Sequence, residues 1–220
     1  YYSLEEHESM RKVVRELAEV YPNQQYVMNL AALHGQLGDR QQQLALVEAM
    51  LDDGRVTRSA YLRMLASLFL AENLPFKAAR LLEQSIAEGK IEADIQTLEQ
   101  LSQAWYLAQE FDRAIEPLAR AAQQSETGDL YLRLAGLHMD AYDWAAADEA
   151  AELALTKGDL KREGDAWLLR GMANAQLERF DAAERLFNKA LAFESVRSHA
   201  NRWLVYVAGE RRTRSVSATP

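Results

Sequence analysis

The sequence predicts an all-α protein, a right-handed superhelix (α-solenoid) made of antiparallel helix pairs. Three observations indicate this fold. Apolar residues recur with helical spacing along most of the 220 residues, proline occurs only four times, and one pattern of small and aromatic residues returns about every 35 positions. A unit of two helices cannot bury both of its apolar faces alone, so the units must stack on one another.

The last unit shows the pattern most clearly, in "EGDAWLLRGMANAQLERFDAAERLFNKALAFES". A 34-residue frame that begins at Gly164 places Trp167 at position 4, Gly171 at 8, Ala183 at 20 and Phe187 at 24. Bulky residues at 4, 7, 11 and 24 fill the space between helices, and small residues at 8, 20 and 27 let the helices approach closely. A glycine costs a helix about 1 kcal/mol relative to alanine, so we expect position 8 to face position 20 at a tight crossing.

The same frame begins near residues 24, 59, 95, 128 and 164, which predicts five repeats over residues 24–195. Residues 1–22 match the second half of the frame and are expected to form the second helix of a truncated preceding repeat. Residues 196–208 predict a helix that caps the last repeat, and the polar residues 209–220 predict a disordered tail.

Two residues differ from the type usual at their frame positions, and two prolines lie inside or at the start of a predicted helix. Gln43 stands where alanine is expected, and Arg170 stands where leucine is usual. Pro117 lies inside a second helix, where it should remove one hydrogen bond and kink or delay the helix. Pro75 lies at the start of another second helix, where proline is favoured.

Composition restricts the classes of function. The formal net charge is −8, which argues against nucleic acid as a partner, because phosphate binding needs clustered Lys and Arg. The chain has no cysteine, so no disulfide is expected, and it has no run of about 18 apolar residues that would span a membrane. Because the sequence starts at Tyr1, we expect a fragment or a processed form.

No motif for catalysis or cofactor binding occurs, so we expect a protein that is not an enzyme and that uses no cofactor or metal. The four histidines fall in different repeats, and we expect them at packing or surface positions. Paired acids such as Asp148–Glu149 are expected on solvated faces. Three arginines of the tail, Arg211, Arg212 and Arg214, are either solvated or form a contact with an anionic membrane or an acidic partner.

The best candidate binding residues lie on the first helix of each pair, which lines the concave surface of such solenoids. We assign them to frame positions 2, 5, 9, 12 and 13, where Met and Leu with scattered polar groups suit an amphipathic or extended peptide. The alternative is that these are ordinary exposed positions. The candidates are Met28, Gln36, Arg63, Glu99, Gln103, Tyr106, Leu132, Met139, Asp140, Leu168, Met172 and Gln176.

The repeats over residues 59–190 resemble tetratricopeptide-repeat (TPR) proteins. Residues 98–187, with the turn "LTKGDLKREGDAWLLRGMA", and the later "NRWLVYV" are also similar to the TPR proteins that accompany TonB–ExbB–ExbD systems in gammaproteobacteria. This resemblance covers most of residues 60–208. It implies a periplasmic adaptor that supports TonB-dependent transport, with TonB, ExbB, ExbD or an outer-membrane receptor as partner, and it implies no catalytic residue.

Other functions stay open at this stage. Members of the superfamily that bind acidic chaperone tails carry Lys at position 5 and Asn at position 9, and no repeat here has both, so such a clamp is not expected. A cytosolic assembly or regulatory chaperone is the main alternative. The chain could also belong to a longer enzyme, or form a homo-oligomer through its end helices.

Overall fold

The computed structural model describes residues 24–52, 56 and 58–217, and the isolated positions 9, 12, 13 and 16. The truncated preceding repeat predicted for residues 1–22 therefore lies almost wholly outside the described residues. In the described part the chain forms helices and no strand. The helices are α2 (Gln24–Gln36), α3 (Arg40–Asp52), α4 (Ser59–Ala71), α5 (Pro75–Ala87), α6 (Ile95–Leu107), α7 (Phe111–Gln124), α8 (Asp129–Asp140), α9 (Trp144–Lys157), α10 (Glu163–Gln176), α11 (Phe180–Ala190) and α12 (Glu194–Ser217).

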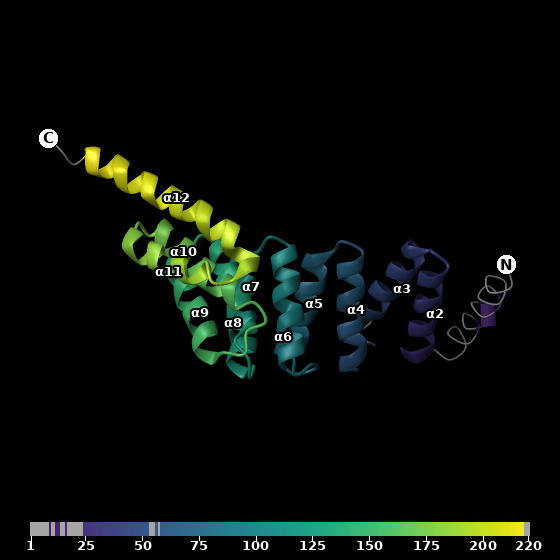
Figure 1. Cartoon of the computed structure of the whole chain (residues 1–220). Helices are drawn as coiled ribbons and strands as arrows, with labels where there is room; N and C mark the ends of the chain where they lie inside the picture. The colour runs from purple at the N-terminus through teal and green to yellow at the C-terminus, as the bar shows by residue number, and fades with distance from the viewer. Residues whose placement is uncertain are drawn as a thin grey trace.

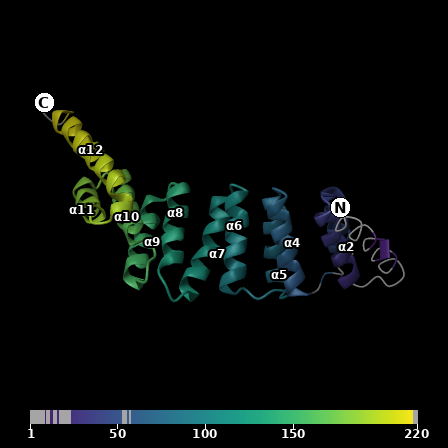
Figure 2. The same cartoon turned by 45° about the vertical axis from the view of Figure 1, so that its right-hand side comes forward.

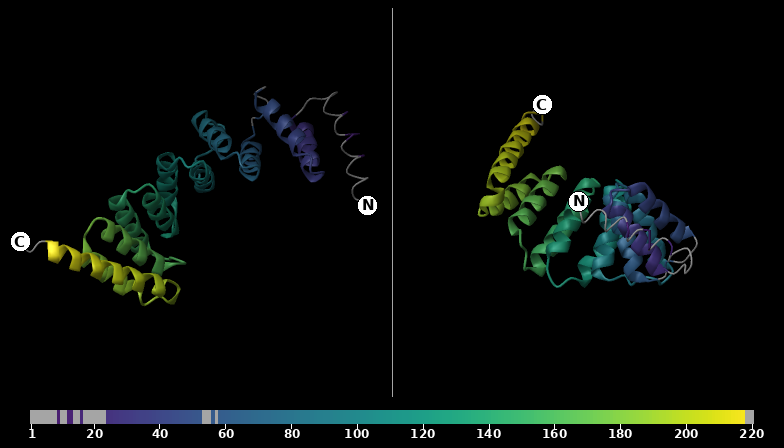
Figure 3. Two further views of the ribbon diagram at one scale, coloured as in Figure 1. Left: turned by 90° about the horizontal axis from the view of Figure 1, so that it is seen from above. Right: turned by 90° about the vertical axis from the view of Figure 1, so that its right-hand side faces the viewer.

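The helices form five antiparallel pairs that stack into an elongated body (Figure 1, Figure 2). The first helices, α2, α4, α6, α8 and α10, begin within one residue of the five frame starts. Seen from above, the pairs follow a curved path from one end of the molecule to the other (Figure 3, left). None of the helices that the structure describes is both long and apolar enough to cross a membrane.

Each pair turns through one residue in the left-handed backbone region. The turn residue is Gly38 in the first repeat, and Asn73, Gln109, Tyr142 and Glu178, with φ between 56° and 62°, in the next four. All five stand at frame position 15. In each turn the following N–H donates to the carbonyl oxygen five residues back, as from Leu74 to Phe69 at 2.8 Å, which is the Schellman geometry that ends a helix.

The small residue at position 8 is explained by two different contacts. A Cβ added at Gly171 would lie 2.5 Å from the ring of Phe187, so in the fifth repeat the glycine makes room for the aromatic residue at position 24 rather than for position 20. In the third repeat positions 8 and 20 do face each other, because the buried Ser102 hydroxyl donates to the carbonyl oxygen of Ala114 at 2.8 Å.

The structure accommodates the residues that depart from the frame. Arg170 is largely buried between α9 and α10, where it binds Asp148 at 2.7 Å and Glu152 at 3.0 Å. Asp148 is thus an ion-pair partner with little exposure, not a residue of a solvated face. Gly35 lies against the amide of Gln43, so the long side chain has room. Helix α7 continues from Phe111 to Gln124 through the buried Pro117.

The aromatic residues of the frame divide into two groups. Trp105 and Phe187 are completely buried, whereas Tyr131, Trp144 and Trp167 are only partly buried. The guanidinium of Arg113 lies 3.5 Å above the ring of Trp105, and it also binds the carboxylate of Glu83 at 2.8 Å. Through Arg113, α7 therefore contacts both α6, the first helix of its own repeat, and α5, the second helix of the repeat before.

Helix α12 takes the place of a sixth first helix. It packs against α11 and α10, with Val196, Ala200 and Val207 buried and Trp203 stacked on Phe187 at 5.8 Å. The helix continues to Ser217, so the disordered tail predicted from residue 209 is wrong for residues 209–217. The reason is a set of ion pairs that local composition does not show, from Arg211 to two acids of α11 and from Arg214 to Glu178 in the turn before α11.

The junction between the first and second repeats is open. At the later junctions each second helix packs closely against the next first helix, but α3 makes few contacts with α4. A cavity of about 610 Å³ lies between α3 and α5, with Leu62 and Phe69 of α4 in its wall. Ion pairs from Arg40 to Glu72 and from Lys77 to Glu48 bridge this junction.

Candidate functional site

Eleven of the twelve predicted groove residues reach the surface. Five are exposed: Gln36, Gln103, Tyr106, Asp140 and Gln176. Six are half-buried: Arg63, Glu99, Leu132, Met139, Leu168 and Met172. Met28 is only 4% exposed, so its assignment to the groove is wrong. Its flexible apolar side chain packs in the core of the first repeat, where the charged Arg63 and Glu99 at the same frame position cannot go.

Three cavities join along the first helices of the second to fifth repeats. The α4–α6 cavity is about 440 Å³, the α6–α8 cavity about 570 Å³, and the α8–α10 cavity, which also reaches α6, about 730 Å³. Neighbouring cavities share wall residues, because Glu99, Gln103 and Arg133 each belong to two of them. We call the three together the groove.

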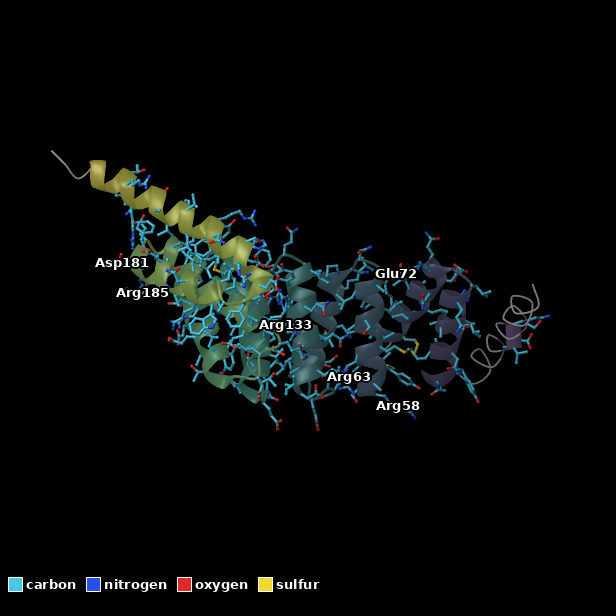
Figure 4. All side chains as sticks on the ribbon, in the orientation of Figure 1. Arg58, Arg63, Glu72, Arg133, Asp181 and Arg185 are labelled. Atoms are coloured by element: carbon cyan, nitrogen blue, oxygen red, sulfur yellow. The ribbon has the colours of Figure 1, made fainter. Side chains whose placement is uncertain are left out.

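The groove contains part of the predicted set. Seven candidates lie in its wall: Arg63, Glu99, Gln103, Tyr106, Leu132, Asp140 and Leu168. Four surface candidates do not lie in the wall of these cavities: Gln36, Met139, Met172 and Gln176. Arg63 on α4 and Arg133 on α8 mark the groove on either side of α6 (Figure 4).

Sequence reasoning missed frame position 6. Met64, Gln100 and Arg133 all stand at this position and all line the groove. Position 6 follows position 5 by 100° around the helix, so the first helices turn a broader face to the groove than positions 2, 5, 9, 12 and 13 describe. Lys161 and Arg162, from the turn before α10, were also missed because the frame treats that turn as a spacer.

Polar contacts connect neighbouring first helices across the groove. Arg133 of α8 forms an ion pair with Glu99 of α6. The hydroxyl of Tyr106 donates to Asp140 Oδ2 at 3.0 Å, which again joins α6 to α8. Gln100 Nε2 of α6 donates to Ser67 Oγ of α4 at 2.8 Å. These contacts orient Arg133, Tyr106 and Gln100 before any ligand binds.

Two groups beside the groove have perturbed acidities. The hydrogen bond to Asp140 and the negative charge of that carboxylate raise the pKa of Tyr106 above its usual value. Asp94 caps α6 by accepting the backbone N–H of Thr97 at 2.8 Å, and this hydrogen bond lowers the pKa of the Asp94 carboxyl. Tyr106 is therefore a neutral hydroxyl and Asp94 a carboxylate at neutral pH.

The described residues contain no cluster of three or more His, Asp and Glu side chains arranged to hold a metal ion. His34 and His138 occupy packing positions, as expected, each beside the Asp that starts the following helix. His199 is exposed on α12, and His7 lies outside the described residues.

No protein-family model matches the sequence, and no curated protein matches it. Solved structures match in fold. The C-terminal part of a TPR repeat-containing protein from Cytophaga hutchinsonii aligns with a TM-score of 0.63 and 13% identity, over 96% of this chain and 86% of that one. A crystal structure of MamA protein gives 0.59 and 20% identity, over 79% and 92%. MamA from Desulfovibrio magneticus RS-1 gives 0.58 and 15%, over 73% and 89%. The chain therefore has the TPR solenoid fold that its repeats predict.

Proposed function

We propose that this protein is a non-enzymatic scaffold for protein–protein interaction, which binds a segment of its partner in the groove. The observation that carries the proposal is the continuity of the groove over α4, α6, α8 and α10. Its wall offers exposed or half-buried anchors, among them Tyr106 and Leu132, whose burial by a partner would supply affinity.

The contacts across the groove also support binding. Because Tyr106 and Arg133 are already held by Asp140 and Glu99, ordering these long side chains costs little when a partner arrives. Binding in such a groove uses surface from several repeats at once, so the helices from α4 to α10 act together as the binding platform.

For the pathway, we propose a periplasmic adaptor that supports TonB-dependent transport, with TonB, ExbB, ExbD or an outer-membrane receptor as the partner. The support for this part is the sequence resemblance over residues 60–208 alone. A cytosolic assembly chaperone is the competing function, and the two differ in compartment and in partner.

The test is site-specific photo-crosslinking in cells that produce the full-length protein. A photoreactive phenylalanine analogue replaces Tyr106 in the groove or, as a matched control, Tyr142, which is 77% exposed in the turn between α8 and α9. We expect a partner to be crosslinked from position 106 and not from position 142. Crosslinks from position 142 alone would contradict groove binding.

The identity of the captured protein tests the pathway separately. TonB, ExbB, ExbD or an outer-membrane receptor captured from position 106 would support the periplasmic adaptor. Capture of cytosolic proteins only, together with recovery of the protein in the cytosolic fraction, would reject that role in favour of the chaperone.

A further inference from the structure

Every charged side chain in the groove wall already has an oppositely charged or hydrogen-bonding partner. Arg133 is paired with Glu99, and Arg162 with Asp165. Lys161 Nζ lies 3.7 Å from Asp129, and Arg63 Nη1 lies 3.5 Å from Asp94. The remaining carboxylate, that of Asp140, accepts the hydroxyl hydrogen bond of Tyr106.

The described wall of the groove is neutral as a whole. It contains four cations, Arg63, Arg133, Lys161 and Arg162, and four carboxylates, Glu99, Asp129, Asp140 and Asp165. The protein carries a net charge of −8, so its acidic excess lies outside this wall. An acidic segment would have to break existing ion pairs to obtain a cation. A basic segment would find only one wall carboxylate outside an ion pair, that of Asp140, which already accepts the hydrogen bond of Tyr106.

The largest of the three cavities has an apolar floor. Ile95, Leu130, Leu132, Leu168 and Leu169 line it, and its volume of about 730 Å³ exceeds that of any single side chain. Leu132 and Leu168 are half-buried and line this cavity. Filling such a space with a bulky apolar side chain removes apolar surface from water on both partners.

The α4–α6 end of the groove offers amides instead. Within the described part of the chain, the side-chain amides of Gln96 and Gln103 make no hydrogen bond, and both are exposed in the wall of the α4–α6 cavity. An amide group both donates and accepts, which matches the N–H and C=O groups of an extended backbone. A helical segment satisfies its backbone groups internally and would leave these amides unused.

We infer that the groove takes an extended peptide segment of no net charge, with a bulky apolar side chain seated in the α8–α10 cavity and its backbone on Gln96 and Gln103. This inference rests on the proposed function and specifies its ligand. It also predicts weak salt dependence, because no new ion pair forms when the segment binds.

The experiment is selection of random peptides displayed on phage against the immobilised full chain, followed by affinity measurement on the enriched peptides. We expect charge-balanced sequences that share an aromatic residue or leucine, with affinity that changes less than about threefold between 0.05 and 0.5 M NaCl. Leu132→Asp should weaken their binding at least tenfold. Leu153→Asp, at a residue that is 42% exposed on α9, is the matched control and should leave binding unchanged.

A second variant, Gln103→Ala, removes an exposed amide without placing a charge in a half-buried site, and it should weaken binding about threefold. Enrichment of strongly acidic or basic peptides, lost on Leu132→Asp, would overturn this inference and leave groove binding intact. Enriched peptides whose affinity is unaffected by both groove variants would overturn the inference and the proposed groove function together.

Discussion

A methyl group on the α-carbon of Gly171 would collide with the ring of Phe187. The ring is completely buried and also stacks on Trp203, so it cannot move aside without disturbing α12. A single missing side chain thus lets α10, α11 and α12 meet around one aromatic residue. The helix-forming cost of the glycine is offset by this packing.

Gly171→Ala should destabilise the protein by roughly 1–3 kcal/mol through overpacking, although alanine is the better helix former. Gly136→Ala is the matched control, because a Cβ added at Gly136 in α8 meets no atom within 4 Å. The control should stabilise by up to about 1 kcal/mol. Chemical unfolding of both variants measures the difference, and equal effects of the same sign would contradict the packing argument.

His138 is a largely buried histidine whose neutral form is favoured by burial. Burial lowers the pKa of its imidazole below the ordinary value of 6.5, although Asp143 and Glu149 act in the opposite direction. The Nδ1 atom of His138 lies 3.8 Å from Asp143 Oδ2, and Nδ1 has no hydrogen-bond partner among the described residues. Below pH 6.5 the unfolded chain therefore binds a proton at this residue more readily than the folded chain does.

Stability should consequently fall as the pH decreases from 7.5 to 5.5, and His138→Leu should remove part of this fall. Leucine is neutral at every pH. His199→Leu, at an exposed residue of α12, is the control and should keep the wild-type slope. The measurement is the free energy of unfolding in denaturant at several pH values. An identical slope for wild type and His138→Leu would reject this linkage.

For single residues, the sequence predicts the structure well at frame positions that accept one type of residue. The small residue at position 8 could be predicted, but its partner could not, because Ser102 and Gly171 serve different contacts at the same frame position. Met28 was misplaced because side-chain flexibility, not frame position, decides whether it enters the core. The left-handed residue at position 15 went unnoticed because only the first repeat has glycine there.

Helix α12 is one element held by two kinds of interaction. Its first part, to about residue 207, is anchored by apolar side chains against α10 and α11. Its later part is held by arginines. Arg211 binds Glu184 at 2.7 Å and also pairs with Asp181, while Arg214 binds Glu178 at 2.6 Å and lies over the ring of Phe180. Such partly exposed ion pairs weaken as salt increases.

Arg211→Gln combined with Arg214→Gln should free the end of α12 without unfolding the solenoid. Hydrogen exchange followed by mass spectrometry should show faster exchange in peptides beyond residue 208 and unchanged exchange over residues 194–207. Raising NaCl to 0.5 M should act in the same direction on wild type. Arg202→Gln, an exposed arginine of the same helix, is the control. Unchanged exchange beyond residue 208 in the double variant would show that the ion pairs do not hold this part.

Helices with a strong apolar period could be predicted from the sequence, whereas the later part of α12 could not. The period predicts a helix over residues 197–208 because Ala200, Trp203, Leu204 and Val207 share a face. Beyond residue 208 the helix depends on carboxylates about 30 positions earlier in the chain, and no local pattern reports such contacts. The groove has the same limit, because the ion pair of Arg133 with Glu99 and the hydrogen bond of Tyr106 to Asp140 each join residues 34 positions apart.

The described part of the molecule is a row of helix pairs, and each pair packs mainly against the pairs next to it along the stack. Stability should therefore be lost locally when one end is removed. A chain that ends at residue 193 lacks α12 and exposes Phe187, whereas a chain that ends at residue 208 keeps the apolar cap.

We expect the shorter chain to lose hydrogen-exchange protection in α10 and α11 and to keep it in α4 and α5, while the chain ending at residue 208 behaves nearly as wild type. Equal loss of protection along the entire shorter chain would indicate one cooperative unit instead. The sequence predicted the number and order of these units, because stacking follows from the repeat, but not the uneven strength of the junctions between them.

That unevenness has a mechanical consequence. Between α3 and α4 the helices pack less closely than at the later junctions. A cavity lies there, and apolar core contacts and side-chain ion pairs join the two repeats. Distances between spin labels at Gln41 and Gln84 should therefore spread more widely than those between Gln84 and Gln123, and equal spreads would refute this. Under tension along the length of the molecule, the junction between α3 and α4 should deform first. The pair of α2 and α3 can then change its orientation while the groove keeps its shape.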